Sequence, residues 1–124
     1  MIRLNLEHRV AQSGEHFLVL TLPDGAFVMA TENVEALQAA LAEYRAIMLP
    51  AIDATAPTGM LDALVDPLCR MTPDPFFGGG VLQIRHPGLG WLTIRLPSES
   101  LKELNRISRV LMEADSGSAA LGAH

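Results

Sequence analysis

The sequence contains one pattern twice: two short apolar strands joined by a turn, then an amphipathic helix. In the first copy, residues 16–22 and 26–30 have the composition of strands, and Pro23-Asp24-Gly25 between them is typical of a turn. Apolar residues at helical spacing follow from Thr31, which is placed to cap the helix. The pattern predicts a ββα unit over residues about 16–48.

In the second copy, residues 81–86 and 91–96 form the predicted strands, and Pro87-Gly88-Leu89-Gly90 forms the turn. Ser98 or Ser100 then caps a second helix, whose apolar residues recur at helical spacing. These features predict a second ββα unit over residues about 81–114, so the chain has the pattern of a tandem ββα pseudo-repeat.

The whole pattern predicts an α+β fold in a single domain over residues 1–114. Because residues 2–10 alternate between apolar and polar, we expect a further strand there, in a mainly antiparallel sheet of about five strands. Two long helices would pack on one face of this sheet. We expect a proline-rich connector over residues 49–77, with one short helix near 59–66, and a flexible tail over residues 115–124.

The face that each strand residue occupies depends on the hairpin loops. If each hairpin has a three-residue loop, Leu22 pairs with Ala26 and Pro87 pairs with Trp91. An apolar cluster of the first hairpin then points away from the helices. The members of this cluster are Phe17, Val19, Phe27 and Met29. An apolar cluster outside the core usually marks an interaction surface, so these are the predicted partner-binding residues. The alternative is that another part of the chain covers them.

Composition excludes several classes of protein. Hydrophobic residues make up 49% of the chain and charged residues 19%, which is typical of a folded domain. No apolar run approaches the roughly 18 residues that a membrane span needs. The single cysteine, Cys69, excludes an internal disulfide, so we expect a cytoplasmic protein and a buried, inert thiol. The net charge of −5 argues against nucleic-acid binding as a general role.

No set of residues in the sequence has the spacing of a catalytic or metal site. The four histidines lack the spacing of metal ligands, although His8 and His16 could meet across a first hairpin. The expected protein has no cofactor. The polar residues best placed to bind a ligand are Arg85 and Arg95, on neighbouring strands, with Trp91 on the same face. The glycines before residue 81, Gly79 among them, would form a hinge or a lid, with Phe76 and Phe77 anchored in the core under the hinge interpretation.

These features favour a non-enzymatic protein-interaction module, such as a small cytosolic adaptor, regulator or inhibitor, acting as a homodimer. The alternative is a small-ligand-binding domain or small enzyme, with a site between the two repeats near Arg85, Trp91, Arg95 and Gly79. A third interpretation is binding of single-stranded nucleic acid by the same arginine and tryptophan residues.

Overall fold

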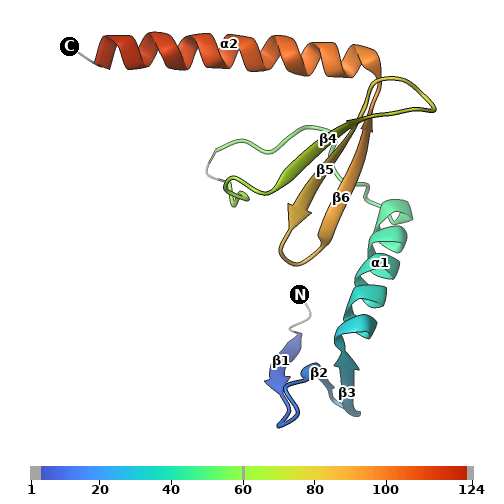
Figure 1. Ribbon diagram of the computed structural model, residues 1–124. Coiled ribbons are helices and arrows are strands. Elements are labelled where there is room, and N and C mark those ends of the chain that lie inside the picture. Colours follow the sequence, from blue (N-terminus) through green and yellow to red (C-terminus); the bar gives the residue numbers. More distant parts are fainter. Residues whose placement is uncertain (1–3, 60, 123–124) are drawn as a thin grey trace. The chain divides into compact units, whose positions relative to one another are not determined.

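The computed structural model describes residues 4–59 and 61–122, and the chain divides into two compact units, Met1–Leu61 and Asp62–His124. Each unit has a three-stranded antiparallel sheet followed by one helix, as Figure 1 shows. The first unit contains β1 (Asn5–Val10), β2 (His16–Leu22), β3 (Gly25–Ala30) and α1 (Thr31–Ile47). The second contains β4 (Cys69–Pro73), β5 (Gly80–His86), β6 (Gly90–Leu96) and α2 (Ser98–Gly122).

The α+β class is confirmed, but the expected single sheet of about five strands is wrong for the described residues. The strands form two sheets, with the orders β1-β2-β3 and β4-β5-β6. The difference arises from β4, a five-residue strand inside the predicted connector, which pairs with β5. The ladder extends to Leu68, whose carbonyl accepts the Arg85 N–H at 2.9 Å. Each helix therefore follows a complete three-stranded meander.

The short helix expected near residues 59–66 does not form in the described part of that segment, residues 59 and 61–66. Gly59 and Asp66 have positive φ values of 92° and 48°, which a right-handed helix does not allow. The end of the second helix also differs from the expectation, because α2 continues past residue 114 to Gly122. Residues 123 and 124 of the predicted tail, and residue 60 of the predicted helix, lie outside the described residues.

The register of the first hairpin corrects the predicted partner-binding cluster. Leu22 pairs with Gly25 and not with Ala26, so the loop has two residues, Pro23 and Asp24. A shift of one residue moves every β3 side chain to the opposite face relative to β2. The four residues Phe17, Val19, Phe27 and Met29 therefore do not share a face.

The first sheet has two faces of different composition. The helix-side face carries Leu6, His8, Val10, His16, Leu18, Leu20, Leu22, Phe27 and Met29. The outer face carries Asn5, Glu7, Arg9, Phe17, Val19, Thr21, Ala26, Val28 and Ala30. Val34 of α1 lines one hollow with four residues of the first of these faces, His8, His16, Leu18 and Met29, and with Phe17 of the outer face. The helix therefore begins on the side of the sheet that carries most of its large apolar side chains.

The second sheet has the faces that the sequence predicts. Arg85 pairs with Trp91, whereas the three-residue loop expected from the sequence would pair Pro87 with Trp91. A shift of two residues keeps each side chain on the same face of the sheet, so the predicted faces of β5 and β6 are correct. The apolar face carries Met71, Leu82, Ile84, Leu92, Ile94 and Leu96. The arginine face carries Arg70, Gln83, Arg85, Trp91, Thr93 and Arg95.

The apolar side chains lie on regular elements, yet none of those in the described residues is buried. The chain has an accessible surface of 11179 Å². Two separate compact units, each of half the mass of the chain, would together expose about 7,800 Å². Contacts between the units could only reduce the area of about 7,800 Å². The accessible surface of the chain exceeds this area by about 3,400 Å², and a compact fold would cover that difference.

Candidate functional site

The first unit presents an apolar surface that begins under α1 and continues beyond it. Val34 in the second turn of α1 is half-buried against the sheet. Exposure then rises along the helical stripe, to 42% at Leu37, 58% at Leu41 and 64% at Tyr44. Phe27 on the helix-side face is 58% exposed. An uncovered surface of this kind usually marks an interaction site.

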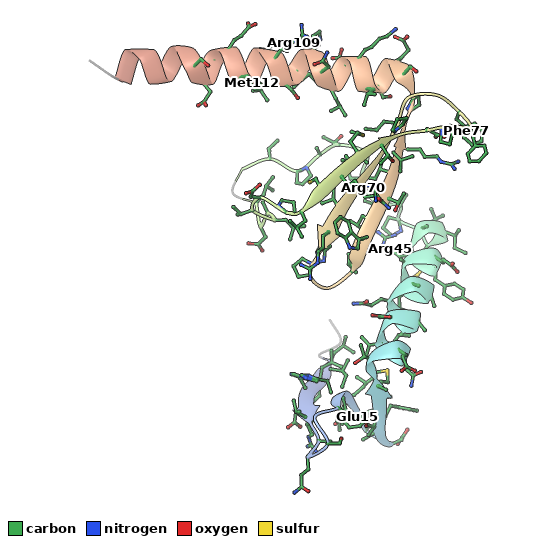
Figure 2. All side chains as sticks on the ribbon, in the orientation of Figure 1. Glu15, Arg45, Arg70, Phe77, Arg109 and Met112 are labelled. Carbon is green, nitrogen blue, oxygen red and sulfur yellow. The ribbon has the colours of Figure 1, made fainter. Side chains whose placement is uncertain are left out.

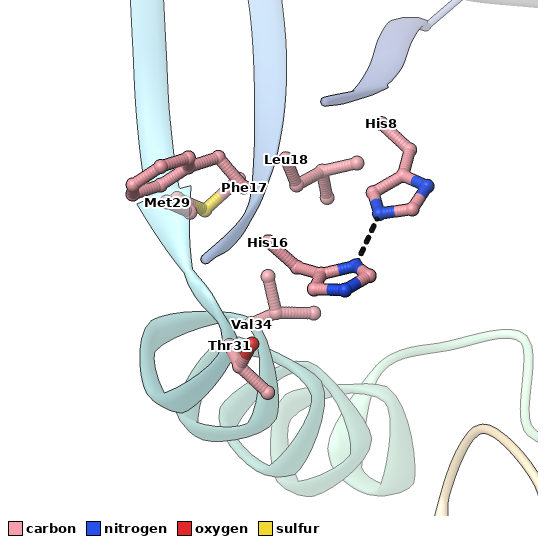
Figure 3. A pocket seen from close by; sticks show the side chains of 7 residues that line it. All are labelled: His8, His16, Phe17, Leu18, Met29, Thr31 and Val34. Atoms are coloured by element: carbon pink, nitrogen blue, oxygen red, sulfur yellow. Dashed lines mark hydrogen bonds between the residues drawn. The ribbon is translucent and has the colours of Figure 1, made fainter. Parts of the chain in front are cut away.

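His8 and His16 meet at the rim of a hollow of about 230 Å³, as the sequence suggested (Figure 3). Nε2 of His8 lies 2.8 Å from Nδ1 of His16, and the rings are stacked with their centroids 5.0 Å apart. One ring must donate and the other accept in this contact. The described residues contain no group of three or more metal-ligating side chains, so this pair is a polar edge on an otherwise apolar hollow.

The second unit leaves its apolar face and most of α2 uncovered. Figure 1 shows that the first turns of α2 lie at the end of β6. The helix contacts the sheet there, and Leu101 Cδ2 would lie 3.7 Å from a Cβ added at Gly80. Beyond that point Leu104, Ile107 and Leu111 form an exposed stripe. At 25 residues, α2 is about 37 Å long, more than its own sheet can cover. Most of the stability of a helix in a folded protein comes from packing of its apolar face. In the described residues, no such packing covers the stripe of Leu104, Ile107 and Leu111.

The arginine face of the second sheet contains one residue that sequence reasoning missed. Arg85 and Trp91 are cross-strand partners, as expected, and Trp91 is 51% exposed. Arg70 on β4, labelled in Figure 2, pairs with Gln83 and so occupies the adjacent row of the same face. The sequence did not reveal Arg70 as part of this face because β4 lies in a proline-rich segment without a clear alternating pattern.

Arg95 lies on the same face but belongs to a different local arrangement. It is four residues from Trp91 along β6, or about 13 Å. Its Nε is 3.6 Å from Oδ2 of Asp74, and its guanidinium lies over the Phe77 ring, 4.8 Å from the centroid. A hollow of about 280 Å³ adjoins these three side chains. The structure therefore does not combine Arg85, Trp91 and Arg95 into one compact ligand site.

The glycine loop before β5 is held by Asp74, whose side chain is 2% exposed. Its Oδ1 accepts the backbone N–H groups of Phe76 at 3.0 Å and Phe77 at 3.2 Å. Gly79 has φ +77°, and a Cβ there would clash with the Leu96 carbonyl oxygen. The close approach of two chain segments thus accounts for this glycine without a ligand. The expectation that Phe76 and Phe77 are anchored in the core is wrong, since both are exposed.

Cys69 does not have the environment expected for it. The thiol is exposed, and its Sγ donates to the Pro67 carbonyl at 3.2 Å. The β4 strand brings the cysteine to an edge of the sheet that no described strand covers. Among the described residues, no histidine or basic side chain hydrogen-bonds to this thiol.

Ion pairs shift the pKa values of two exposed carboxyl groups. The hydrogen bond from Arg9 lowers the pKa of Glu7 on β1, and Arg106 lowers the pKa of Glu103 on α2 in the same way. Both pairs lie in solvent, where they contribute little to stability. They place charged side chains on the outer face of the first sheet and on the exposed side of α2.

Comparisons of this chain with models of known protein families, with curated proteins and with solved structures found no match. No helix in the described residues is long and apolar enough to cross a membrane. The two uncovered apolar faces and the arginine face are therefore the candidate functional surfaces of the described residues.

Proposed function

We propose that this protein is a non-enzymatic protein-interaction module that forms a homodimer through its uncovered apolar faces. The observation that carries this proposal is the absence of a buried apolar side chain in the described residues, although 49% of the chain is hydrophobic. Hydrophobic burial is the main driving force for folding, so apolar faces placed on regular elements need a cover. A partner surface supplies that cover.

The size of the uncovered surface supports a second copy as the first partner. Each chain exposes about 3,400 Å² more than two compact units would, so a dimer that covers this excess buries about 6,800 Å² in total. Obligate homodimers bury about 2,000 to 5,000 Å² or more, in apolar interfaces that resemble a divided core. An ordinary transient complex of about 1,600 Å² would leave most of the excess exposed.

In this proposal the interface contains the helix-side face of the first sheet and the apolar face of the second. Phe27 and Met29 of the predicted partner-binding cluster lie on the first of these faces. Phe17 and Val19 lie on the outer face, together with the Glu7–Arg9 ion pair, and they are assigned to the surface that remains in water. A sheet with one apolar and one mixed face usually buries the apolar one.

The dimer would act as an adaptor, regulator or inhibitor in the cytosol. An exposed single thiol such as Cys69 is compatible with a reducing compartment. We do not propose the alternative of a ligand site that combines Arg85, Trp91 and Arg95, because Arg95 faces Asp74 and lies about 13 Å from Trp91.

Sedimentation equilibrium across a wide range of concentrations, with native mass spectrometry of the untagged protein, tests the proposal. We expect a species of twice the 13.4 kDa chain mass. We also expect a urea midpoint that rises with protein concentration, because folding and association are then coupled. A monomer at all concentrations, with a concentration-independent midpoint and a compact radius of gyration, would show that the chain covers its own apolar faces.

A further inference from the structure

The arginine face of the second sheet is a surface that dimerisation through the apolar faces leaves free. Arg70 and Arg85 are both exposed, and neither forms an ion pair with any residue that the structure describes. Arg95, the third arginine on this face, is already shared between Asp74 and Phe77. Two free guanidinium groups therefore lie beside an exposed Trp91.

We propose that this face binds an acidic segment of another protein in an extended conformation. Arg70 and Arg85 lie one strand and one row apart, so their backbone positions are separated by about 8 Å. Alternate side chains of an extended chain are about 6.6 Å apart, which lets carboxylates two residues apart reach the two guanidinium groups. Arginine suits this role because its planar fork matches a carboxylate with two parallel hydrogen bonds.

Trp91 provides the apolar part of the same surface. It lies directly opposite Arg85 on the neighbouring strand, at a spacing at which the two side chains can both contact one bound segment. Gln83 and Thr93 occupy the row between Trp91 and Arg95, and Gln83 Nε2 lies 3.4 Å from Thr93 Oγ1. The preferred segment thus carries two alternating acidic residues next to an apolar one.

An acidic protein segment fits this face better than a nucleic acid does. Sites for single-stranded nucleic acid stack successive bases on several aromatic rings. Trp91 is the one aromatic residue on this face among the strand residues described, because Phe77 lies in the loop under Arg95.

Fluorescence anisotropy tests this inference with a labelled 12-residue peptide whose alternate positions are Glu, Glu and Leu in repeat, with Thr at the positions between them. We expect the dimeric wild-type protein to bind it at low salt and to release it at high salt. The double variant Arg70→Gln/Arg85→Gln should weaken binding about 10-fold, since each exposed ion pair contributes modestly. The matched control Lys102→Gln/Arg109→Gln removes the same charge from α2 (Figure 2 labels Arg109) and should bind like the wild type.

Four results of the binding measurements would overturn the inference. These are no binding by the wild type, equal weakening in the control variant, equal affinity for a peptide with Gln in place of Glu, or tighter binding of a 12-nucleotide thymidine strand. The mass of each variant is measured in parallel. If Arg70→Gln/Arg85→Gln dissociated the dimer, the arginine face would be a self-association surface and the inference would be wrong. The mass and anisotropy measurements therefore separate this inference from the proposed dimerisation.

Discussion

Replacing Phe27 by Glu is the most direct perturbation of the proposed dimer. The side chain is 58% exposed on the helix-side face. A phenylalanine offers roughly 200 Å² of surface, so about 120 Å² remains for a partner to cover. At about 25 cal/mol per Å², this area contributes about 3 kcal/mol per protomer. A symmetric interface uses the residue twice, so the change weakens dimerisation by about 6 kcal/mol, or about 10⁴-fold in Kd.

The neighbouring residue provides the matched control. Val28 is 63% exposed, it precedes Met29 on the same strand, and it points to the outer face. Val28→Glu adds the same charge to an apolar, exposed position of β3, so any general effect of a glutamate in this strand appears in both variants. We expect Val28→Glu to remain a dimer at concentrations at which Phe27→Glu is dissociated.

Sedimentation velocity over a dilution series gives both dissociation constants, and circular dichroism at each concentration records the helix content. Equal dissociation of the two variants would refute the assignment of the interface to the helix-side face. Dissociation by Val28→Glu alone would place the interface on the outer face with Phe17 and Val19. If Phe27→Glu lost its structure while the wild type was monomeric at every concentration, Phe27 would belong to the core of a single chain.

Three further predictions concern single groups in the second unit. Gly79→Ala should destabilise the unit by about 2 kcal/mol in urea unfolding, because the new Cβ clashes with the Leu96 carbonyl oxygen and φ at this position is positive. An unchanged urea midpoint would show that the backbone segments at Gly79 and Leu96 can move apart without loss of stability. Asp74→Ala should cost about 3 kcal/mol through the loss of two backbone hydrogen bonds, and Asp74→Asn should cost less because it retains an acceptor oxygen; equal losses would assign the stability to charge. The Glu103 carboxyl should titrate below pH 4.5 in carbon-detected NMR, and Arg106→Gln should raise its pKa. Because the pKa is lowered in the folded state, the small stabilisation from this pair is present above pH 4.5 and is lost as the pH falls through the folded-state pKa. An unaltered Glu103 titration in Arg106→Gln would contradict the pairing.

The two hairpins show why one face assignment from the sequence succeeded and the other failed. Both hairpins have a recognisable turn sequence and the expected strands. In the second, the real register differs from the expected one by two residues, and side chains two residues apart point the same way. In the first, the loop closes on Gly25 in place of Ala26, and this shift of one residue reverses β3. Alternation along a strand defines two faces, but loop length decides which faces of neighbouring strands match.

The residues that sequence reasoning missed belong to β4 and to the loop after it. A five-residue strand that ends in Pro73 has too short a pattern to be recognised, so Arg70 could not be assigned to a sheet face. Phe76 and Phe77 have the composition of core anchors, but Asp74 binds their backbone N–H groups and leaves both rings exposed. The exposure of these two rings depends on Asp74, which is not part of the spacing of apolar residues, so that spacing does not predict it.

Because the apolar faces of the described residues lack a cover, we expect folding and association to be coupled in this protein. Periodicity places apolar side chains on one side of a strand or helix, but the surface that covers them comes from elsewhere and leaves no mark in the local sequence. Within each unit that cover is absent for the described side chains. In the proposed dimer, the contact that completes the hydrophobic core is also the contact that binds the partner copy. Substitutions on the helix-side face should therefore change stability and association together, by amounts that depend on protein concentration, whereas substitutions on the arginine face should change partner binding alone.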